Sequence, residues 1–291
     1  MDVANVDGLV VQSAYRMRDI HNVSAHDHHF NLLEDDSYSN ARSIINDSKP
    51  DLVINAIASG VASSIDTNIS TRVNVEWPSE LARICEEEGV SSFIHFGSCA
   101  EYGTVSFEPA ETTDLAPMTP YGVSKAAGTT ALLNTNLKTL NMIVLRLYPV
   151  FGIYEQPNKI FPQIITGLFG NNSVNLGDKH KVRNYSYSKD VARHIFTLGS
   201  MSITQDMPTV INIGSDTTLS LGEWSDRFAQ TQGNSINTHN LNWGFNASSP
   251  GDPDFMAPNL NLLKSLIGPS LGISRNAYAD TFQYWVDMNN D

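Results

Sequence analysis

The sequence contains only two cysteines, Cys85 and Cys99, among its 291 residues. So few cysteines exclude a disulfide-stapled secreted domain and favour a reducing compartment. No stretch approaches the roughly 18 consecutive apolar residues that a membrane-spanning helix needs. The first residues, Met1 to Asp7, are acidic where a secretory leader is basic and then apolar. From these absences we expect a cytoplasmic protein without a membrane partner.

Basic residues are scarce as well. Lysine and arginine number 18 against 31 aspartates and glutamates, which gives a formal net charge of −13. The electrostatic field of a negatively charged protein repels polyanions at long range, so we expect no nucleic-acid partner. A local basic pocket for one phosphate-bearing ligand is still compatible with this net charge. With 41% hydrophobic and 17% charged residues, the composition is that of a globular protein rather than a disordered chain or a coiled coil.

Strand and helix patterns alternate through the first half of the chain. Leu52–Ala58 and Phe93–Gly97 are short apolar runs that predict buried parallel strands. Residues 78–89 between them predict a helix, because a proline opens the segment and a glycine closes it. A helix beginning at 119–120 and a strand over 142–148 continue the alternation. This order predicts an α/β fold with a doubly wound, Rossmann-like parallel sheet that binds ligands at the carboxyl ends of its strands.

The second half of the chain is less regular. Gly, Asn, Pro and Ser separate many short pieces, among which Leu176 and Val210–Gly214 are candidate strands. The stretch Asn234–Asp254 is the loosest, and we expect a surface loop or lid there. We expect this half to form a smaller C-terminal substrate-binding region.

Tyr121 and Lys125 lie four residues apart directly after the predicted helix start, so that the phenol and the ammonium share one helix face. A lysine beside a tyrosine stabilises the phenolate and lowers the phenol pKa from about 10. The pair then serves as a proton donor and acceptor. This spacing alone arises often by chance. However, Ser98 at the end of the second predicted strand would project into the same crevice and hydrogen-bond the reacting oxygen.

At this point the sequence resembles a known family, the extended short-chain dehydrogenases/reductases, and within it the nucleotide-sugar epimerase, dehydratase and reductase branch. The resemblance follows the order of several segments: Pro50–Ala56, Asn74-Val75, Gly97-Ser98, Pro120–Lys125, Arg146–Gly152, Lys159–Pro162, Gly177-Asp178, Arg183–Tyr185, Asp190–Ala192 and Asn212–Ser215 with Leu221.

The resemblance implies a catalytic triad of Ser98, Tyr121 and Lys125 beside a nicotinamide ring. Tyr121 would exchange a proton with a sugar hydroxyl or keto oxygen, and Ser98 would orient that oxygen on the substrate. Lys125 would bind the cofactor ribose and lower the tyrosine pKa. The implied cofactor contacts are Asp27, Ala56, Asn74, Tyr121, Lys125 and Tyr148. Lys159 and Arg183 would grip the diphosphate of a nucleotide-sugar through their charge.

The same resemblance implies that the chain has two regions with different functions. Residues 1–153 would form the dinucleotide-binding Rossmann-like domain, and residues 154–291 a substrate-binding region partly interleaved with it. The cofactor would be NAD or NADP. Asp27, as the acid ending a second strand over Val23–Asp27, would contact the ribose hydroxyls and favour NAD. Because relatives often pair through a four-helix interface, a homodimer is an expectation by analogy.

Departures from the family pattern keep several alternatives open. The glycine-rich turn that lets the backbone approach a pyrophosphate is missing, since Gly8–Val11 offers one glycine where two should stand. We therefore expect that the first strand is absent, or that Leu9–Val11 forms a first strand of unusual sequence. The alternative to an enzyme is a catalytically silent member of the family kept for binding or assembly.

A second departure concerns the reaction. Cys99 and Ala100 occupy the places of the Asp-Glu pair of dehydratases, which disfavours 4,6-dehydration and leaves C4 epimerisation or keto-sugar reduction. Pro149 stands where many relatives place a substrate-contacting asparagine.

Two conspicuous runs have plain interpretations. The run His26–His29 has the composition of a metal site, but neighbouring residues of an extended chain point to opposite faces, so we expect a solvated loop and no metal. Glu86–Glu88 ends the predicted helix against its dipole and is expected to be an exposed acidic face.

Overall fold

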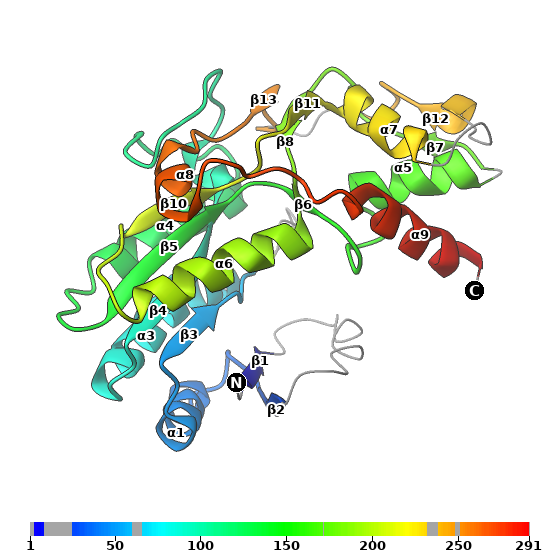
Figure 1. The fold of residues 1–291 in the computed structure, drawn as a ribbon. Helices are drawn as coiled ribbons and strands as arrows, with labels where there is room; N and C mark the ends of the chain where they lie inside the picture. The colour runs from blue at the N-terminus through cyan, green and yellow to red at the C-terminus, as the bar shows by residue number, and fades with distance from the viewer. Residues whose placement is uncertain are drawn as a thin grey trace. The chain divides into compact units, whose positions relative to one another are not determined.

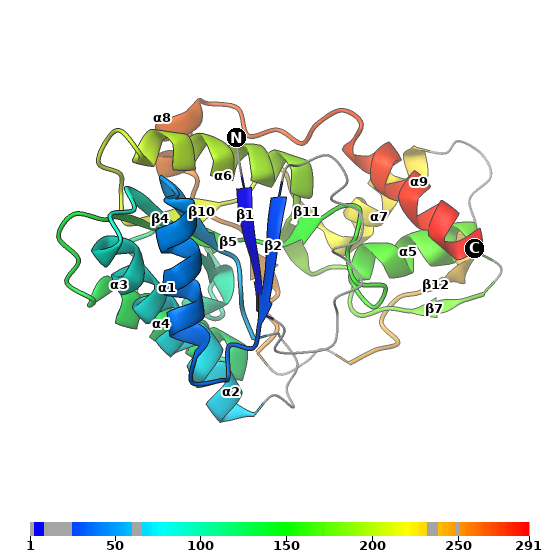
Figure 2. The same ribbon diagram turned by 90° about the horizontal axis from the view of Figure 1, so that it is seen from below.

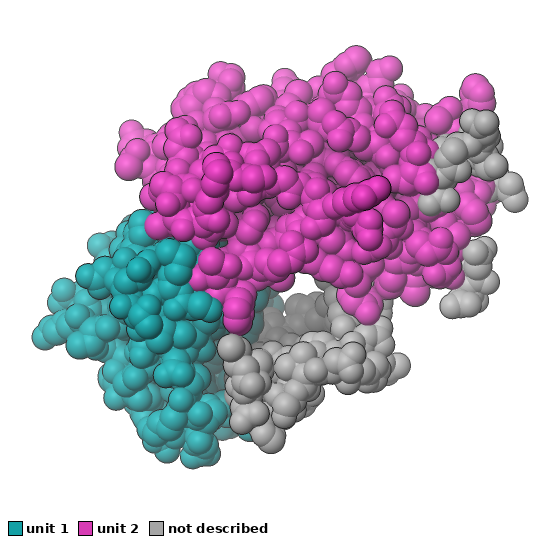
Figure 3. All heavy atoms as spheres, viewed as in Figure 1, with its two compact units in different colours: residues 1–101, 117–146, 198–211 teal, residues 102–116, 147–197, 212–291 magenta. Residues whose placement is uncertain are grey.

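The computed structural model describes residues 3–8, 25–59, 66–170, 172–231, 238–247 and 251–290. The chain divides into two compact units (Figure 3). Unit 1 consists of residues 1–101, 117–146 and 198–211, and unit 2 of residues 102–116, 147–197 and 212–291. Each unit is therefore assembled from segments that are far apart in the sequence.

Unit 1 is built on a sheet with the strand order β10-β5-β4-β3 (Figure 1). These strands are Val210–Ile213, Asn141–Leu147, Ser92–Ser98 and Leu52–Asn55. β3 and β4 pair in parallel, with Leu52 opposite Ser92. Successive strands β3, β4 and β5 are neighbours, and helices connect each to the next, as in a doubly wound sheet. The predicted α/β, Rossmann-like class is confirmed.

Helices pack on both faces of this sheet. The helical elements are α1 (Ser37–Ser48), α2 (Thr67–Thr71), the π turn η2 (Arg72–Glu76), α3 (Trp77–Glu87), α4 (Pro120–Leu133) and the last residues, 198–202, of α6 (Ser188–Ser202). Phe93 of β4 is buried in one cluster with Trp77 and Leu132 from α3 and α4. A Cβ added to Gly199 of α6 would lie 3.3 Å from the next strand residue, Ile94. Because alternate strand residues face opposite sides, α3 and α4 cover one face and the end of α6 covers the other.

The helix before β4 begins earlier than Pro78 predicts. It starts at Thr67, where Asp66 caps it by accepting a 2.7 Å hydrogen bond from the Asn68 N–H. Pro78 then lies inside the helical run rather than at its start. A proline has no N–H for the carbonyl four residues earlier, that of Asn74, and the chain takes the π turn η2 at this point. The π turn accommodates a proline that the sequence pattern assigns to a helix start.

Helix α4 packs closely on the π turn. Its predicted start is confirmed, since the Thr119 hydroxyl accepts the Gly122 N–H at 3.0 Å. A Cβ added to Gly128 would lie 1.9 Å from the Asn74 carbonyl oxygen. Gly128 therefore lets the backbones of α4 and η2 approach each other.

The chain does have a first strand, contrary to the expectation from its missing glycines. β1 (Val3–Gly8) and β2 (Ala25–Phe30) pair in parallel, with Asn5 opposite Asp27 (Figure 2). β2 continues to Phe30, so Asp27 does not end it, and the histidine run lies in a strand rather than a loop. Residues 9–24, with the altered turn, and the side chain of Asp27 lie outside the described part of the chain.

Two further expectations for unit 1 are wrong. β3 is shorter than predicted and stands at the end of the strand order, and Ile54 within it is 44% exposed. The acidic run at the end of α3 is not simply a solvated face. Glu87 and Glu88 pair with Arg42 at 2.5 and 2.8 Å, and Glu86 accepts the Thr139 N–H at 2.7 Å.

Unit 2 combines short strands with helices. The three-stranded sheet has the order β11-β8-β13, of strands Thr218–Ser220, Val182–Asn184 and Phe255–Met256. Parallel pairs form between β6 (Val150–Phe151) and β9 (Ser186–Tyr187), and between β7 (Val174–Asn175) and β12 (Leu241–Asn242). The helices in the described part of unit 2 include α5 (Ile160–Phe169), α7 (Leu221–Gln230), α8 (Asn261–Ile267) and α9 (Ala277–Asn290), with the short 3-10 helix η4 (Thr238–Asn240). The 3-10 helix η3 (Cys99–Tyr102) belongs to unit 1 as far as Glu101.

Aromatic side chains form the core of unit 2. Phe151 lies within 6.0 Å, between ring centroids, of Phe161, Trp224 and Phe228. Offset and edge-to-face pairs of this kind add to the free energy of burial. Leu176 follows β7 rather than forming a strand. The expected loop over Asn234–Asp254 contains η4 and β12 in its described part. No helix of the described residues is long and apolar enough to cross a membrane.

Replacing Gly128 with alanine should destabilise unit 1, because the new Cβ meets a backbone carbonyl that cannot swing aside. We expect the free energy of unfolding to fall by about 1–3 kcal/mol in urea denaturation. Gly177→Ala is the matched control, since a Cβ there meets nothing within 4 Å. Equal stability of the two variants would contradict the close approach of α4 and η2.

Candidate active site

Ser98 and Tyr121, two of the three predicted catalytic residues, meet in unit 1. Ser98 ends β4, and Tyr121 lies in the first turn of α4. The Ser98 hydroxyl lies near enough to the Tyr121 phenol to lower its pKa by favouring the phenolate. The Ser98 hydroxyl also accepts the Ala100 N–H at 3.2 Å. The fold thus places a hydroxyl and a phenol together at the carboxyl end of a buried strand, where sheets of this type bind ligands.

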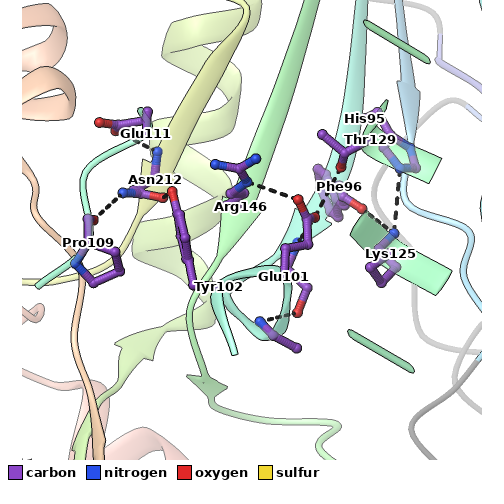
Figure 4. A network of polar contacts seen from close by, with 12 residues as sticks. His95, Phe96, Glu101, Tyr102, Pro109, Glu111, Lys125, Thr129, Arg146 and Asn212 are labelled. Atoms are coloured by element: carbon purple, nitrogen blue, oxygen red, sulfur yellow. Dashed lines mark hydrogen bonds and ion pairs between the residues drawn. The ribbon is translucent and has the colours of Figure 1, made fainter. Parts of the chain in front are cut away.

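The carboxylate of Glu101 holds this strand end in place (Figure 4). Its Oε1 accepts the Ser98 N–H at 2.8 Å and the Thr129 hydroxyl at 3.1 Å. Its Oε2 accepts the Arg146 Nε–H at 2.9 Å. The side chains of Glu101 and Arg146 are 0% and 4% exposed. One carboxylate therefore joins β4, α4 and β5 out of contact with water.

Gly97 provides the space for this carboxylate, since a Cβ there would lie 2.7 Å from Glu101 Oε1. From its place three residues after Ser98, Glu101 could equally contact a substrate or pack within a loop. The sequence does contain a signal of the role that the structure shows. A glycine lies four residues before the acid, and an arginine lies inside an apolar strand. This combination indicates a buried ion pair rather than a residue that touches substrate.

Lys125 is 1% exposed and does not lie free beside the tyrosine. Its Nζ donates to the Phe96 carbonyl oxygen and lies 3.5 Å from His95 Nε2 (Figure 4). The His95 Nδ1 in turn lies 3.0 Å from Asn55 Nδ2. His95 and Asn55 are members of the site that the sequence patterns did not single out.

Burial dominates the proton affinities of the site. It raises the pKa of Tyr121 to about 12, while the hydrogen bond with Ser98 opposes the rise. It lowers the pKa of Lys125 to about 8, against the effect of the Glu101 carboxylate. Burial also holds the pKa of His95 well below its usual value, and the charge of Lys125 adds to this effect. The expected lowering of the Tyr121 pKa is therefore absent from this structure, because desolvation outweighs the hydrogen bond.

Asn74, a predicted cofactor residue, links the segment after β3 to the helix that carries Tyr121. Its Oδ1 accepts the Ser59 N–H at 2.8 Å, and its Nδ2 donates to the Ser124 hydroxyl at 2.9 Å. Ala56, the next predicted cofactor position, is exposed directly after β3. Both residues belong to unit 1.

The remaining predicted residues belong to unit 2. Tyr148 is 3% exposed, and its N–H donates to the Ile213 carbonyl at 2.9 Å. Lys159 is exposed at the start of α5. Arg183 of β8 is buried, and its Nη2 lies 2.7 Å from an Asp252 oxygen. The second oxygen of Asp252 binds Lys181 at 2.7 Å, so one carboxylate holds two buried cations that the sequence patterns did not connect.

A doubly wound α/β unit that pairs a strand-end serine with a helix-start tyrosine, with a lysine one turn further on, defines a Rossmann-like protein of the short-chain dehydrogenase/reductase type. The chain belongs to the NAD dependent epimerase/dehydratase family, whose model matches residues 3–214.

Two curated relatives are similar to parts of the chain. A Bacillus subtilis (strain 168) protein described as the uncharacterized UDP-glucose epimerase YtcB is 25% identical over 125 residues, 42% of this chain and 39% of that protein. The dTDP-glucose 4,6-dehydratase of Streptomyces griseus is 29% identical over 161 residues, 54% of this chain and 48% of that enzyme. The matches thus span less than half the length of these relatives.

Solved structures share the fold along the whole chain. MoeE5 in complex with UDP-glucose and NAD has a TM-score of 0.81 at 20% identity, covering 100% of this chain and 92% of MoeE5. The UDP-glucuronic acid 4-epimerase from Bacillus cereus, in complex with UDP-glucuronic acid and NAD, has a TM-score of 0.80 at 19% identity, covering 99% and 91%. These similarities confirm the Rossmann-like architecture.

Replacing Glu101 with glutamine should destabilise the protein strongly, because it removes the charge that pairs with the buried Arg146 guanidinium and sets an amide N–H against one of the donors that now bond the carboxylate. We expect the free energy of unfolding to fall by about 3–5 kcal/mol. The control is Glu80→Gln, which breaks the exposed pair with Arg83 and should cost less than about 1 kcal/mol. Similar losses in both variants, measured by urea denaturation, would show that the buried pair does not hold the strand end.

Proposed function

We propose that the chain is an NAD(P)-dependent enzyme that acts on nucleotide-sugars, as a C4 epimerase or a keto-sugar reductase. The observation that carries this proposal is the placement of the Ser98 hydroxyl beside the Tyr121 phenol at the carboxyl end of β4, with Lys125 one turn further along α4. Family membership supports the same reaction class.

The donor set of unit 1 fits the ribose and nicotinamide end of a dinucleotide. A hydroxyl beside a phenol, with a buried lysine in the same helix as the phenol, is the chemistry required to hold a reacting oxygen. Lys125, Asn74 and the exposed backbone at Ala56 would hold the cofactor, and Asp27 would contact its ribose. When bound, NAD supplies the acceptor or donor of hydride.

Ser98 would orient the substrate oxygen, and Tyr121 would move its proton. Because the Tyr121 pKa is raised to about 12, the phenol is protonated at neutral pH and is poised as a proton donor. Reduction of a keto-sugar needs that role alone, whereas epimerisation also needs the phenolate. Cys99 and Ala100 next to Ser98 offer no carboxylate, so we propose that 4,6-dehydration does not occur.

Arg183 and Lys159 would bind the diphosphate of the substrate. Arg183 donates to Asp252 in this structure, so a diphosphate would share or displace that carboxylate. We further propose that residues 1–153 serve the cofactor and residues 154–291 the substrate, and that the enzyme is a cytoplasmic homodimer.

One observation favours a second candidate, a catalytically silent binding or assembly protein. Lys125 and Arg183, expected to grip ligands, both have protein partners, in Phe96 and Asp252. Calorimetric titration with NAD(H) and NADP(H) separates the candidates. Submillimolar binding of either cofactor supports the enzyme, and no binding supports the silent protein.

Replacing Tyr121 with phenylalanine should remove most turnover, because the proton donor is lost while the ring still packs. We expect kcat to fall by roughly 10²–10⁴, measured as NAD(P)H oxidation with nucleotide-4-keto-sugars and as epimer formation by NMR with UDP-glucose. Tyr154→Phe removes the hydroxyl of a partly exposed tyrosine (38%) and should keep wild-type turnover. Unchanged turnover in Tyr121→Phe would exclude the assigned role.

Replacing Arg183 with glutamine should weaken binding of the nucleotide-sugar and leave cofactor affinity unchanged. We expect KM for the nucleotide-sugar to rise at least tenfold, as for the loss of a charge-assisted contact of about 1.5–3 kcal/mol. Lys138→Gln removes an exposed positive charge and serves as the control. A wild-type KM in Arg183→Gln would assign the diphosphate to other residues.

A further inference from the structure

A row of buried polar groups leads from β3 to Lys125. Asn55 Nδ2 lies 3.0 Å from His95 Nδ1, and His95 Nε2 lies 3.5 Å from Lys125 Nζ. The three residues are 2%, 0% and 1% exposed. Buried polar groups of this kind are held in fixed orientations by their hydrogen bonds.

The backbone determines which end of the Asn55 amide faces the histidine. The Ile57 N–H donates to Asn55 Oδ1 at 3.3 Å, which identifies the oxygen end. The Nδ2 end, which can only donate, therefore faces His95 Nδ1, and Nδ1 must accept. A neutral imidazole carries one N–H, so in His95 that N–H is on Nε2 and points toward Lys125.

This orientation distinguishes the two protonation states of Lys125. An ammonium has three N–H donors and no acceptor, whereas a neutral amine can accept the Nε2–H of His95 and still donate to the Phe96 carbonyl. A hydrogen bond to the neutral form disfavours the charged form. Glu101 in η3 also acts on Lys125: its carboxylate favours the ammonium and is itself paired with Arg146. Burial acts in the same direction as the histidine.

We propose that Asn55 and His95 are positioning residues for Lys125: the amide fixes the imidazole tautomer, and the tautomer presents an N–H that stabilises the neutral amine of the lysine over its ammonium form. For its relevance to catalysis this inference rests on the proposed function, because Lys125 is the residue expected at the cofactor ribose. Cofactor binding would then depend on pH in the range where Lys125 titrates.

The tautomer can be tested on the unmodified protein. A long-range proton–nitrogen correlation spectrum of the ¹⁵N-labelled chain, with His95 identified by comparison with His95→Gln, reports which ring nitrogen carries the proton. We expect an unprotonated Nδ1 and a protonated Nε2 from pH 6 to pH 9. The opposite tautomer, or a charged imidazole in that range, would overturn the proposal.

The effect on Lys125 is tested by reversing the amide. Asn55→Asp places an acceptor at Nδ1, which forces the Nε2 lone pair toward Lys125 and favours the ammonium. In protein labelled at the lysine side chains, with Lys125 assigned through Lys125→Met, the wild-type midpoint is expected near pH 8, from a pKa lowered to about 8. We expect Asn55→Asp to raise that midpoint by at least about one pH unit.

Asn46→Asp, an equal change of charge at an exposed position of α1, should leave the Lys125 midpoint unchanged. An unmoved midpoint in Asn55→Asp, or an equal shift in both variants, would overturn the proposal. If Asn55→Asp does not fold, the wild-type tautomer still decides it. Neither measurement needs a nucleotide, so a failed NAD titration would refute the proposed function while the histidine and lysine spectra tested this inference separately.

Discussion

The buried carboxylate of Glu101 is the interaction on which the site depends. It bonds the Ser98 N–H, the Thr129 hydroxyl and the Arg146 guanidinium at 2.8, 3.1 and 2.9 Å. The Ser98 backbone can therefore not shift at the strand end without losing a hydrogen bond to a buried charge, and such a bond contributes more than most neutral contacts. The Ser98 hydroxyl accepts the Ala100 N–H at 3.2 Å and lies next to the Tyr121 phenol.

Burial shifts the pKa values of the two titratable catalytic residues in opposite directions. It favours the neutral form of each, so Tyr121 keeps its proton and Lys125 loses its proton more readily. Both effects are consistent with a site that donates a proton from the phenol, with a lysine whose charge depends on its surroundings. The polar partners that limit these effects, Ser98 for the phenol and Glu101 for the amine, come from one short segment of the chain.

The sequence patterns predicted what depends on local spacing and missed what depends on long-range contacts. The cap at Thr119, the strand before Ser98 and the fold class followed from periodicity and turn residues. The position of Pro78 inside a helix did not, because the π turn is stabilised by packing against Gly128. The sequence patterns missed Glu101, His95 and Asn55 because the role of each depends on a contact with a residue 28 to 45 positions away. The altered glycine turn misled the reading of the first strand, since β1 forms without it.

The central claim is that Ser98 is fixed against the phenol of Tyr121 inside a desolvated site. It is tested most directly by ultraviolet difference titration of the cofactor-free protein, with the Tyr121 signal isolated by subtraction of Tyr121→Phe and the fold monitored by circular dichroism. The account predicts a midpoint near 12, and a still higher midpoint in Ser98→Ala because the hydrogen bond that favours the phenolate is gone. A Tyr121 midpoint near the ordinary value of about 10, unchanged in Ser98→Ala, would contradict it.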